Sequence, residues 1–170
     1  MTNFYKDKKV LVTGGCSFIG SHLVESLLED GAKVTVVDDL SSGLMENIAN
    51  VKDQIEFILG DLRLGEVANK ATRGQEIVFH LANIHGGRGF IETHPGELCQ
   101  NFLIDGNIYY YSHLHGVDRI CYTSSACAYP TNLQVADPNS QERYLSEEMA
   151  DPFTLGAAFA DGEYGWAKFM

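Results

Sequence analysis

Residues 9–20 read KVLVTGGCSFIG, a short apolar, β-branched run followed directly by a glycine-rich turn. A helical pattern over residues 19–30 comes next and is closed by Gly31, and a second buried run, residues 34–37, ends on Asp38. Strand, turn, helix and strand within about 30 residues predict a βαβ unit. This stretch therefore decides the fold class, which is α/β with a parallel sheet.

Further short apolar runs indicate more strands of the same kind. They lie at residues 55–59, 77–81 and 119–123, and helical patterns lie between them at residues 66–72 and 96–115. Strands that alternate with helices predict a Rossmann-type, doubly wound parallel sheet. We expect residues 1–170 to form one dinucleotide-binding domain, in which residues 131–163 form a long loop towards the active site.

The composition limits the kinds of partner. A chain of 170 residues with 45% hydrophobic and 21% charged residues is typical of a folded domain. A net charge of −11 argues against a nucleic acid or an anionic membrane surface, and no apolar run approaches the roughly 18 residues of a membrane span. The cysteines show no metal-ligand spacing, so we expect no metal site and a reducing, cytoplasmic setting. They are Cys16, Cys99, Cys121 and Cys127.

The glycine-rich turn lies between a strand and a helix, which is the context that a dinucleotide-binding fingerprint requires. Glycine lets the backbone approach a pyrophosphate, and the helix N-terminus offers unpaired N–H groups. Asp38, 18 residues after Gly20, is placed to bind an adenosine ribose and would repel a 2′-phosphate, which favours NAD over NADP. A tight turn without a ligand is the alternative. The expected cofactor contacts of the turn are Gly14, Ser17, Phe18, Ile19 and Gly20.

Six motifs in order resemble those of extended short-chain dehydrogenases/reductases that act on nucleotide sugars. They are TGGCSFIGSHLVE at 13–25, VVDDL at 36–40, GDLR at 60–63, HLAN at 80–83, SSACAYP at 124–130 and YGWAK at 164–168. The resemblance covers nearly the whole chain. Ser17 is a departure, because many members have glycine there, and this puts the spacing to the pyrophosphate in doubt.

The resemblance also implies cofactor contacts outside the glycine turn. Asp61 and Leu62 would contact the adenine, and the alternative for Asp61 is a turn or helix-cap residue. The cofactor cleft would be lined by a short segment after the fourth strand, and one asparagine would support the fold on the nicotinamide side. These residues are Leu81, Ala82, Asn83 and Asn101.

Tyr164 and Lys168 are four residues apart, so on a helix they lie on one face. A nearby ammonium group favours the phenolate form of a tyrosine, which can take a proton from a sugar hydroxyl while a hydride passes to the cofactor. The alternative is a surface pair on an amphipathic helix. By resemblance, Lys168 also binds the nicotinamide ribose, and Ser125, in preference to Ser124, is the catalytic serine beside the sugar oxygen.

The triplet Ser125-Ala126-Cys127 bears on the type of reaction. By resemblance, 4,6-dehydratases have Thr-Asp-Glu at this place and related decarboxylases commonly have glutamate at the position of Cys127, so a triplet without a carboxylate disfavours both. Residues 86–91, GGRGFI, together with Cys127 resemble the GDP-mannose 3,5-epimerases, in which a cysteine acts as acid and base. Oxidation at C4 acidifies the C3 and C5 protons, and a thiol can return a proton. A 4-epimerase needs only the serine, tyrosine and lysine, and Cys127 can be a plain core residue.

The predicted function is that of an NAD-dependent epimerase of a nucleotide-diphosphate sugar, acting through a transient 4-keto intermediate. Gly87, Arg88 and Ser125 are the candidate substrate contacts, although a solvated loop explains the first two almost as well. A dehydratase or decarboxylase of the same family, or a non-catalytic NAD-binding regulator, are the alternatives. Members of the family continue into a C-terminal substrate domain and form homodimers. We therefore expect the fold to be truncated before that domain and residues 1–170 alone to be poorly active.

Overall fold

The computed structural model describes residues 4–131, 145–150 and 160–169. They fall into two compact units, one formed by Met1–Asn83 and Leu103–Tyr122 and the other by Ile84–Phe102 and Thr123–Met170. Most of the predicted loop of residues 131–163, namely 132–144 and 151–159, lies outside the described residues.

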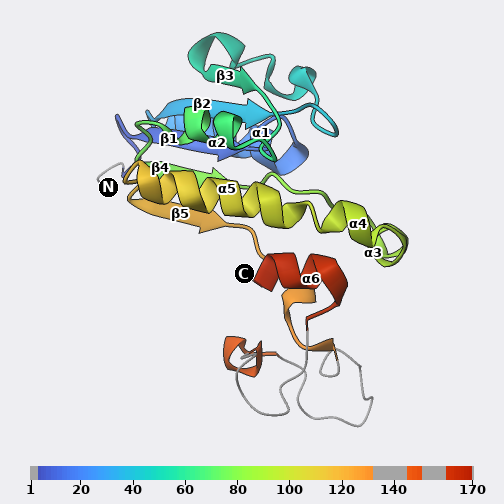
Figure 1. The fold of residues 1–170 in the computed structure, drawn as a ribbon. Helices are drawn as coiled ribbons and strands as arrows, with labels where there is room; N and C mark the ends of the chain where they lie inside the picture. Colours follow the sequence, from blue (N-terminus) through green and yellow to red (C-terminus); the bar gives the residue numbers. More distant parts are fainter. Residues whose placement is uncertain (1–3, 132–144, 151–159, 170) are drawn as a thin grey trace. The chain divides into compact units, whose positions relative to one another are not determined.

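The first unit is built on a parallel sheet, with the described strands in the order β3-β2-β1-β4-β5 (Figure 1). The strands are β1 Lys9–Thr13, β2 Lys33–Asp38, β3 Glu56–Leu59, β4 Ile77–His80 and β5 Arg119–Tyr122. The predicted Rossmann-type sheet is confirmed. Its order changes direction between β1 and β4, and in open sheets of this kind ligands bind at the carboxyl ends of the strands beside such a point.

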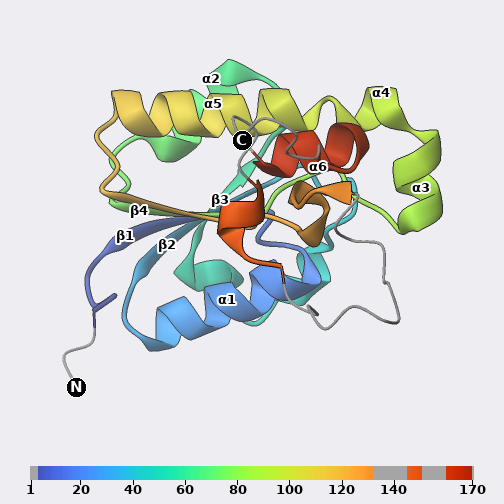
Figure 2. The ribbon, with the colours of Figure 1, turned by 90° about the horizontal axis from the view of Figure 1, so that it is seen from below.

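Helices cover both faces of this sheet. α1 Phe18–Glu29 lies on one face, and α2 Gly65–Thr72 and α5 Asn101–Leu114 lie on the other (Figure 2). Two short 3₁₀ turns, η1 Met45–Ile48 and η2 Lys52–Gln54, connect β2 to β3.

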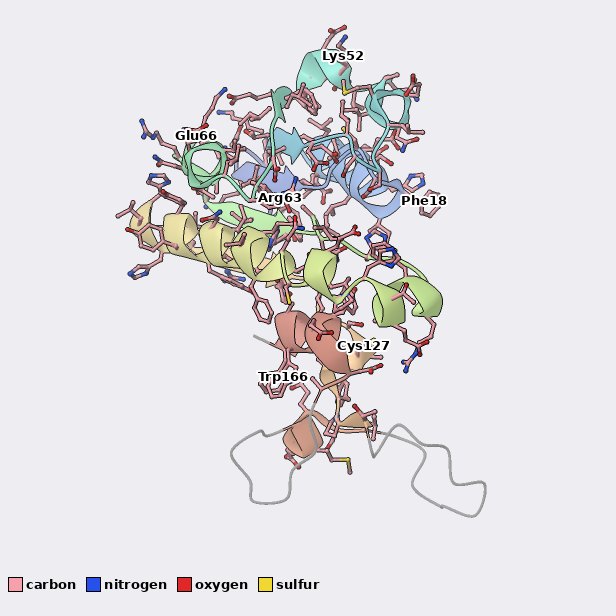
Figure 3. The ribbon with its side chains drawn as sticks, turned by 45° about the vertical axis from the view of Figure 1, so that its right-hand side comes forward. Phe18, Lys52, Arg63, Glu66, Cys127 and Trp166 are labelled. Atoms are coloured by element: carbon pink, nitrogen blue, oxygen red, sulfur yellow. The ribbon has the colours of Figure 1, made fainter. Side chains whose placement is uncertain are left out.

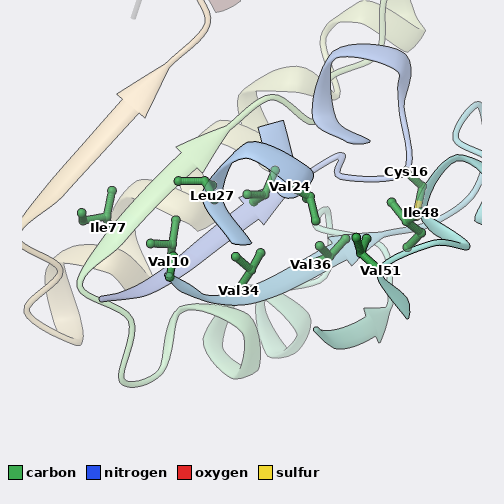
Figure 4. Packing of buried hydrophobic residues seen from close by; sticks show 11 residues of the cluster. Val10, Cys16, Val24, Leu27, Val34, Val36, Ile48, Val51 and Ile77 are labelled. Atoms are coloured by element: carbon green, nitrogen blue, oxygen red, sulfur yellow. The ribbon is translucent and has the colours of Figure 1, made fainter. Parts of the chain in front are cut away.

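The main hydrophobic core lies between α1 and the sheet. Alternate side chains of β1 and β2 point to this face and pack with residues of α1 (Figure 4). They include Val10, Val12, Val34 and Val36 from the strands and Val24 and Leu27 from the helix. The intervening strand residues point to the face of α2 and α5.

The predicted helix over residues 96–115 is wrong in extent. The structure has two helices there, α4 Pro95–Leu98 and α5. Between them the N–H groups of Gln100 and Phe102 bond to carbonyls three residues back, and such tight turns interrupt an α-helix. A third helix, α3 Arg88–Thr93, was not predicted, because the glycines of the GGRGFI segment are typical of a loop.

The second unit contains α3, α4 and α6 Gly162–Phe169, with 3₁₀ turns η3 Ala126–Ala128 and η5 Glu147–Ala150. α6 packs against η3 and α4. The helix expected around Tyr164 and Lys168 is therefore present.

Two observations concern the described residues as a whole. Among them, no helix has the length and apolar character needed to cross a membrane. In the same residues, no group of His, Cys, Asp and Glu side chains is arranged to hold a metal ion.

A chain of hydrogen-bonded polar side chains, most of them buried, links β1, β4, α5 and β5. The hydroxyl oxygen of Thr13 accepts the N–H groups of residues 81–82 at 3.1 and 3.0 Å, so its proton is left for His80 Nδ1, 2.7 Å away. The ring hydrogen of His80 then lies on Nε2, which is 3.0 Å from Asp105 Oδ1. The phenol of Tyr122 donates to Asp105 Oδ2 at 2.8 Å. A sequence pattern does not show such a network, because its members are far apart along the chain.

Replacing Tyr122 with phenylalanine should lower the free energy of unfolding by about 1–3 kcal/mol, because Asp105, which is only 5% exposed, loses a donor to a buried oxygen. Urea denaturation followed by circular dichroism measures the change. Tyr110 on α5 is 61% exposed, and the same substitution there should change stability by less than about 0.5 kcal/mol. Equal effects of the two substitutions would contradict the role assigned to the network.

Candidate functional site

Two glycines allow the backbone to turn sharply from β1 into α1. Gly14 has a φ of 68°, and a Cβ there would lie 3.0 Å from the nitrogen of Ala82. A Cβ on Gly20 would collide with the carbonyl oxygen of Gly14. The first turn of α1 therefore lies directly against the end of β1, which requires glycine at both positions.

Ser17, the departure from the family pattern, is the N-cap of α1. Its φ of −76° does not require glycine. Its hydroxyl donates to the carbonyl of Gly14 at 2.7 Å and accepts the N–H of Gly20 at 3.2 Å. Serine is among the favoured N-cap residues, so the turn keeps its form with serine in place of glycine.

Two backbone N–H groups at the start of α1 are left for a ligand. Within the described part of the chain, the N–H groups of Phe18 and Ile19 have no acceptor. Both residues are strongly exposed, at 76% and 66%, and the Phe18 side chain projects away from the helix (Figure 3). The first turn of α1 contains no acidic residue. Unpaired N–H groups and the positive end of the helix dipole together favour an anion here.

Asp38, the predicted ribose ligand, is 7% exposed, and each oxygen of its carboxylate accepts a hydrogen bond from a backbone N–H group. Its Oδ2 accepts the N–H of Cys16 and its Oδ1 the N–H of Leu40, each at 2.9 Å. Burial, with the charge of Asp38, raises the pKa of the Cys16 thiol to about 12. The carboxylate thus fixes the glycine turn against the end of β2, and each of its oxygens keeps a lone pair for a further donor.

The predicted adenine contacts, Asp61 and Leu62, follow β3. Arg63 binds the Asp61 carboxylate through Nε and Nη2, at 2.8 and 2.6 Å to Oδ2, and this side-chain hydrogen bonding lowers the pKa of Asp61. Asn107 of α5 donates to the carbonyls of Leu62 and Arg63 at 2.9 and 3.0 Å. Sequence reasoning missed Asn107, because its role depends on a hydrogen bond with Leu62, which lies 45 residues before it along the chain.

Leu81 and Ala82 follow β4 and lie beside the glycine turn. Their N–H groups are bonded to Thr13, so contacts with a ligand are left to their side chains and carbonyls. Asn83, the last residue of this segment, is half-buried.

Asn101, in the second unit, is fully buried at the start of α5. Its side-chain oxygen accepts the N–H of Ile84 at 2.7 Å, and its side-chain nitrogen donates to the carbonyl of Ile84 at 2.8 Å. Asn101 thus ties the start of α5 to the loop after β4, while its predicted place on the nicotinamide side stays a prediction.

Gly87 and Arg88, the predicted substrate contacts, are exposed at the start of α3. The guanidinium of Arg88 binds Glu92 one turn along at 2.7 Å and Asp161, which directly precedes α6, at 2.5 Å. Hydrogen bonding to Glu92 and the charge of Asp161 raise the pKa of Arg88. Sequence reasoning missed Asp161.

The two serines after β5 have different roles. Ser124 Oγ donates to the carbonyl of Lys168 at 2.7 Å, and Lys168 Nζ donates to the carbonyl of Thr123 at 3.0 Å. Ser125 is the N-cap of η3 and accepts the N–H of Cys127 at 3.2 Å. The Ser124 hydroxyl proton is thus bonded to α6, whereas the Ser125 hydroxyl accepts a hydrogen bond from the Cys127 N–H group.

Cys127 is fixed by its backbone. Its carbonyl accepts the N–H of Asp161 at 2.9 Å, and a Cβ on Gly165 would collide with the same oxygen. α6 and η3 therefore touch backbone to backbone (Figure 3). On this helix Tyr164 is half-buried, and Lys168 is only 2% exposed.

The structure thus groups the predicted residues within each unit. The first unit brings together the glycine turn, Asp38, Asp61 and the segment after β4, and the second brings Ser125 and Cys127 onto the turn that α6 packs against.

A family model described as "NAD dependent epimerase/dehydratase family" matches residues 10–155. The chain belongs to this family. Among curated relatives, GDP-mannose 3,5-epimerase of Arabidopsis thaliana is 35% identical over 147 residues, which cover 85% of this chain and 38% of that protein. The family membership confirms the resemblance found in the sequence motifs.

Solved structures of epimerases share the fold. UDP-glucose 4-epimerase of Thermus thermophilus, in complex with NAD, is 29% identical with a TM-score of 0.73, over 95% of this chain and 47% of that one. UDP-N-acetylglucosamine 4-epimerase of Methanobrevibacter ruminantium, in complex with UDP-N-acetylmuramic acid, is 28% identical with a TM-score of 0.74, over 96% and 47%. The chain spans less than half the length of these family members.

Replacing Gly165 with alanine should destabilise the second unit by about 1–3 kcal/mol, because the new methyl group meets the carbonyl of Cys127 and α6 must move. Urea unfolding followed by the fluorescence of Trp166, the single tryptophan, measures this.

Gly106, inside α5, gives the matched control, because a Cβ there meets nothing within 4 Å. Its replacement by alanine should raise helix stability by up to about 1 kcal/mol, measured by circular dichroism. A neutral Gly165→Ala variant would show that the close approach of α6 to η3 is not required.

Proposed function

We propose that the protein is an NAD-dependent epimerase of a nucleotide-diphosphate sugar that acts through a transient 4-keto intermediate. The observation that carries the proposal is the combination of Tyr164, Lys168 and Ser125 in a chain of this family, with a glycine turn suited to a pyrophosphate. A non-catalytic NAD-binding regulator does not need all three side chains.

The residues of the first unit fit NAD. The open N–H groups of Phe18 and Ile19 suit the pyrophosphate, and the lack of space for a Cβ at Gly14 and Gly20 fits close approach of the backbone. Asp38 would accept hydrogen bonds from the adenosine ribose. NAD supplies the hydride acceptor that is needed to oxidise a sugar hydroxyl and the hydride donor that reverses the oxidation.

The residues of the second unit would transfer the proton of the sugar hydroxyl. Tyr164 takes the proton of the sugar hydroxyl and later returns it. Lys168, buried on the same face of α6, supplies the positive charge that favours the phenolate and binds the nicotinamide ribose. Ser125 donates its hydroxyl proton to the sugar oxygen, since its side-chain bond with Cys127 uses only its acceptor side.

Epimerisation is favoured over elimination of water. Ser125, Ala126 and Cys127 provide no carboxylate where a dehydratase requires an acid and a base. The names of the relatives above are also those of epimerases. We propose that Gly87 and Arg88 contact the substrate diphosphate or sugar, with Glu92 and Asp161 holding the guanidinium in place.

For the protein at the length of its relatives we propose a homodimer in the cytoplasm. Three large apolar side chains of α5, namely Leu103, Tyr110 and Leu114, are more than half exposed on one side of the helix, as expected of an interface. The four cysteines are free thiols, which fits a reducing compartment.

Replacing Tyr164 with phenylalanine should lower the turnover rate by at least about 10²-fold. NAD should still bind, because only the proton acceptor is lost. The test uses the protein at the length of its relatives, with UDP- and GDP-sugars as substrates, and follows products by NMR. Net accumulation of NADH or loss of water would refute epimerisation.

Glu163, the exposed neighbour of Tyr164 on α6, provides the control. The Glu163→Gln variant should keep turnover within about twofold of the parent protein. An active Tyr164→Phe variant would refute the assigned base.

A second candidate reaction is inversion at C3 and C5 with Cys127 as an acid. It is favoured by the half-buried free cysteine at 127, whose backbone N–H donates to Ser125, and by the 35% identity to a GDP-mannose 3,5-epimerase. In deuterium oxide, label should enter the sugar at C3 or C5 and be lost in the Cys127→Ala variant. The control is Cys99→Ala, which removes an exposed thiol and should leave exchange unchanged. Turnover without exchange would indicate simple 4-epimerisation.

A further inference from the structure

A second polar groove lies at the opposite ends of the strands from the glycine turn. It has a volume of about 410 Å³, within the range of small-molecule sites, and opens at the amino ends of β1, β2 and β3. It is formed entirely by the first unit. The residues that matter for its chemistry are Lys9, Lys33, Arg73, Thr35, Gln75 and Glu56.

Two of these residues form an unfavourable pair in the sheet. Lys9 and Lys33 are register partners on neighbouring parallel strands, so their side chains leave the same face of the sheet. Like charges opposite each other on neighbouring strands are destabilising. A bound anion between them would remove this repulsion.

A third cation, Arg73, lines the same groove. In the described ranges, none of the three cations is within salt-bridge distance of a carboxylate, although Glu76 nearby binds Lys8. In a chain with a net charge of −11, three cations and one carboxylate, Glu56, line this groove, so its positive side chains outnumber its negative ones and favour an anion.

The groove also offers acceptors. The Gln75 side-chain nitrogen donates to the Thr35 hydroxyl at 3.0 Å, while its Oε1 is buried and has no hydrogen-bond partner among the described residues. Glu56, the register partner of Thr35, adds a carboxylate that forms no ion pair in this part of the chain. The Glu56 carboxylate accepts hydrogen bonds, so a ligand that fits the groove should carry hydroxyl groups as well as negative charge.

We propose that this groove binds a phosphate ester of a polyhydroxy compound, such as a sugar phosphate. The phosphate lies between Lys9, Lys33 and Arg73, and a hydroxyl group donates to the Glu56 carboxylate. The groove lies at the amino ends of strands whose carboxyl ends carry the glycine turn, so the two sites of this unit bind their ligands without competition.

The experiment is an NMR titration of the ¹⁵N-labelled chain with glucose 1-phosphate. Amide signals of Thr35, Gly74 and Gln75 should shift and saturate. The variants Lys33→Gln and Arg73→Gln should each weaken binding about tenfold, because each loses one charge-assisted contact.

The control variant Lys52→Gln removes an exposed lysine outside the groove and should bind as the parent does. Inorganic phosphate should bind more weakly than glucose 1-phosphate, and equal affinity would refute the hydroxyl contacts. Shifts that do not saturate, an affinity that is unchanged in the Lys33→Gln and Arg73→Gln variants, or shifts that disappear when NAD is added would overturn the proposal.

Discussion

The first turn of α1 can lie against the end of β1 only because neither Gly14 nor Gly20 carries a side chain. This close approach sets where the helix begins, and it leaves the N–H groups of Phe18 and Ile19 open at the edge of the sheet. A protein with a net charge of −11 repels anions through its side chains, but backbone amides attract them without adding positive residues. The turn thus gives an acidic protein a place that suits the doubly charged pyrophosphate of the proposed cofactor.

Thr13, the last residue of β1, stabilises the same edge of the sheet through its hydroxyl group. Its hydroxyl joins the ends of β1 and β4 and connects to His80, Asp105 and Tyr122 in the interior. Burying these polar groups costs free energy unless each is bonded, and in this chain of contacts donors and acceptors alternate from the backbone to the phenol. A strand end fixed in this way gives the segment after β4 a defined position beside the glycine turn.

The sequence alone was sufficient to predict the parallel sheet, because buried strands are short apolar runs and the glycine turn shows the direction of the chain. It did not show the break between α4 and α5, since a change from α to 3₁₀ hydrogen bonding leaves the apolar pattern intact. Ser17 was doubted as a departure, yet its capping role depends on a φ that composition does not reveal. The hydrogen bond between Asp38 and Cys16 and the contact of Gly165 with Cys127 are not visible in the sequence, because each joins residues far apart along the chain.

The close contact of Gly165 changes what the cysteine of the Ser-Ala-Cys triplet implies. The position of Cys127 is set by its carbonyl, which α6 approaches and Asp161 binds, and any residue at 127 would meet the same constraint. The backbone therefore gives no reason for a cysteine at this place. Nor does packing demand one, since the side chain is only half-buried. Since neither the backbone nor the core requires a thiol at this position, we propose that Cys127 is one of the reacting groups.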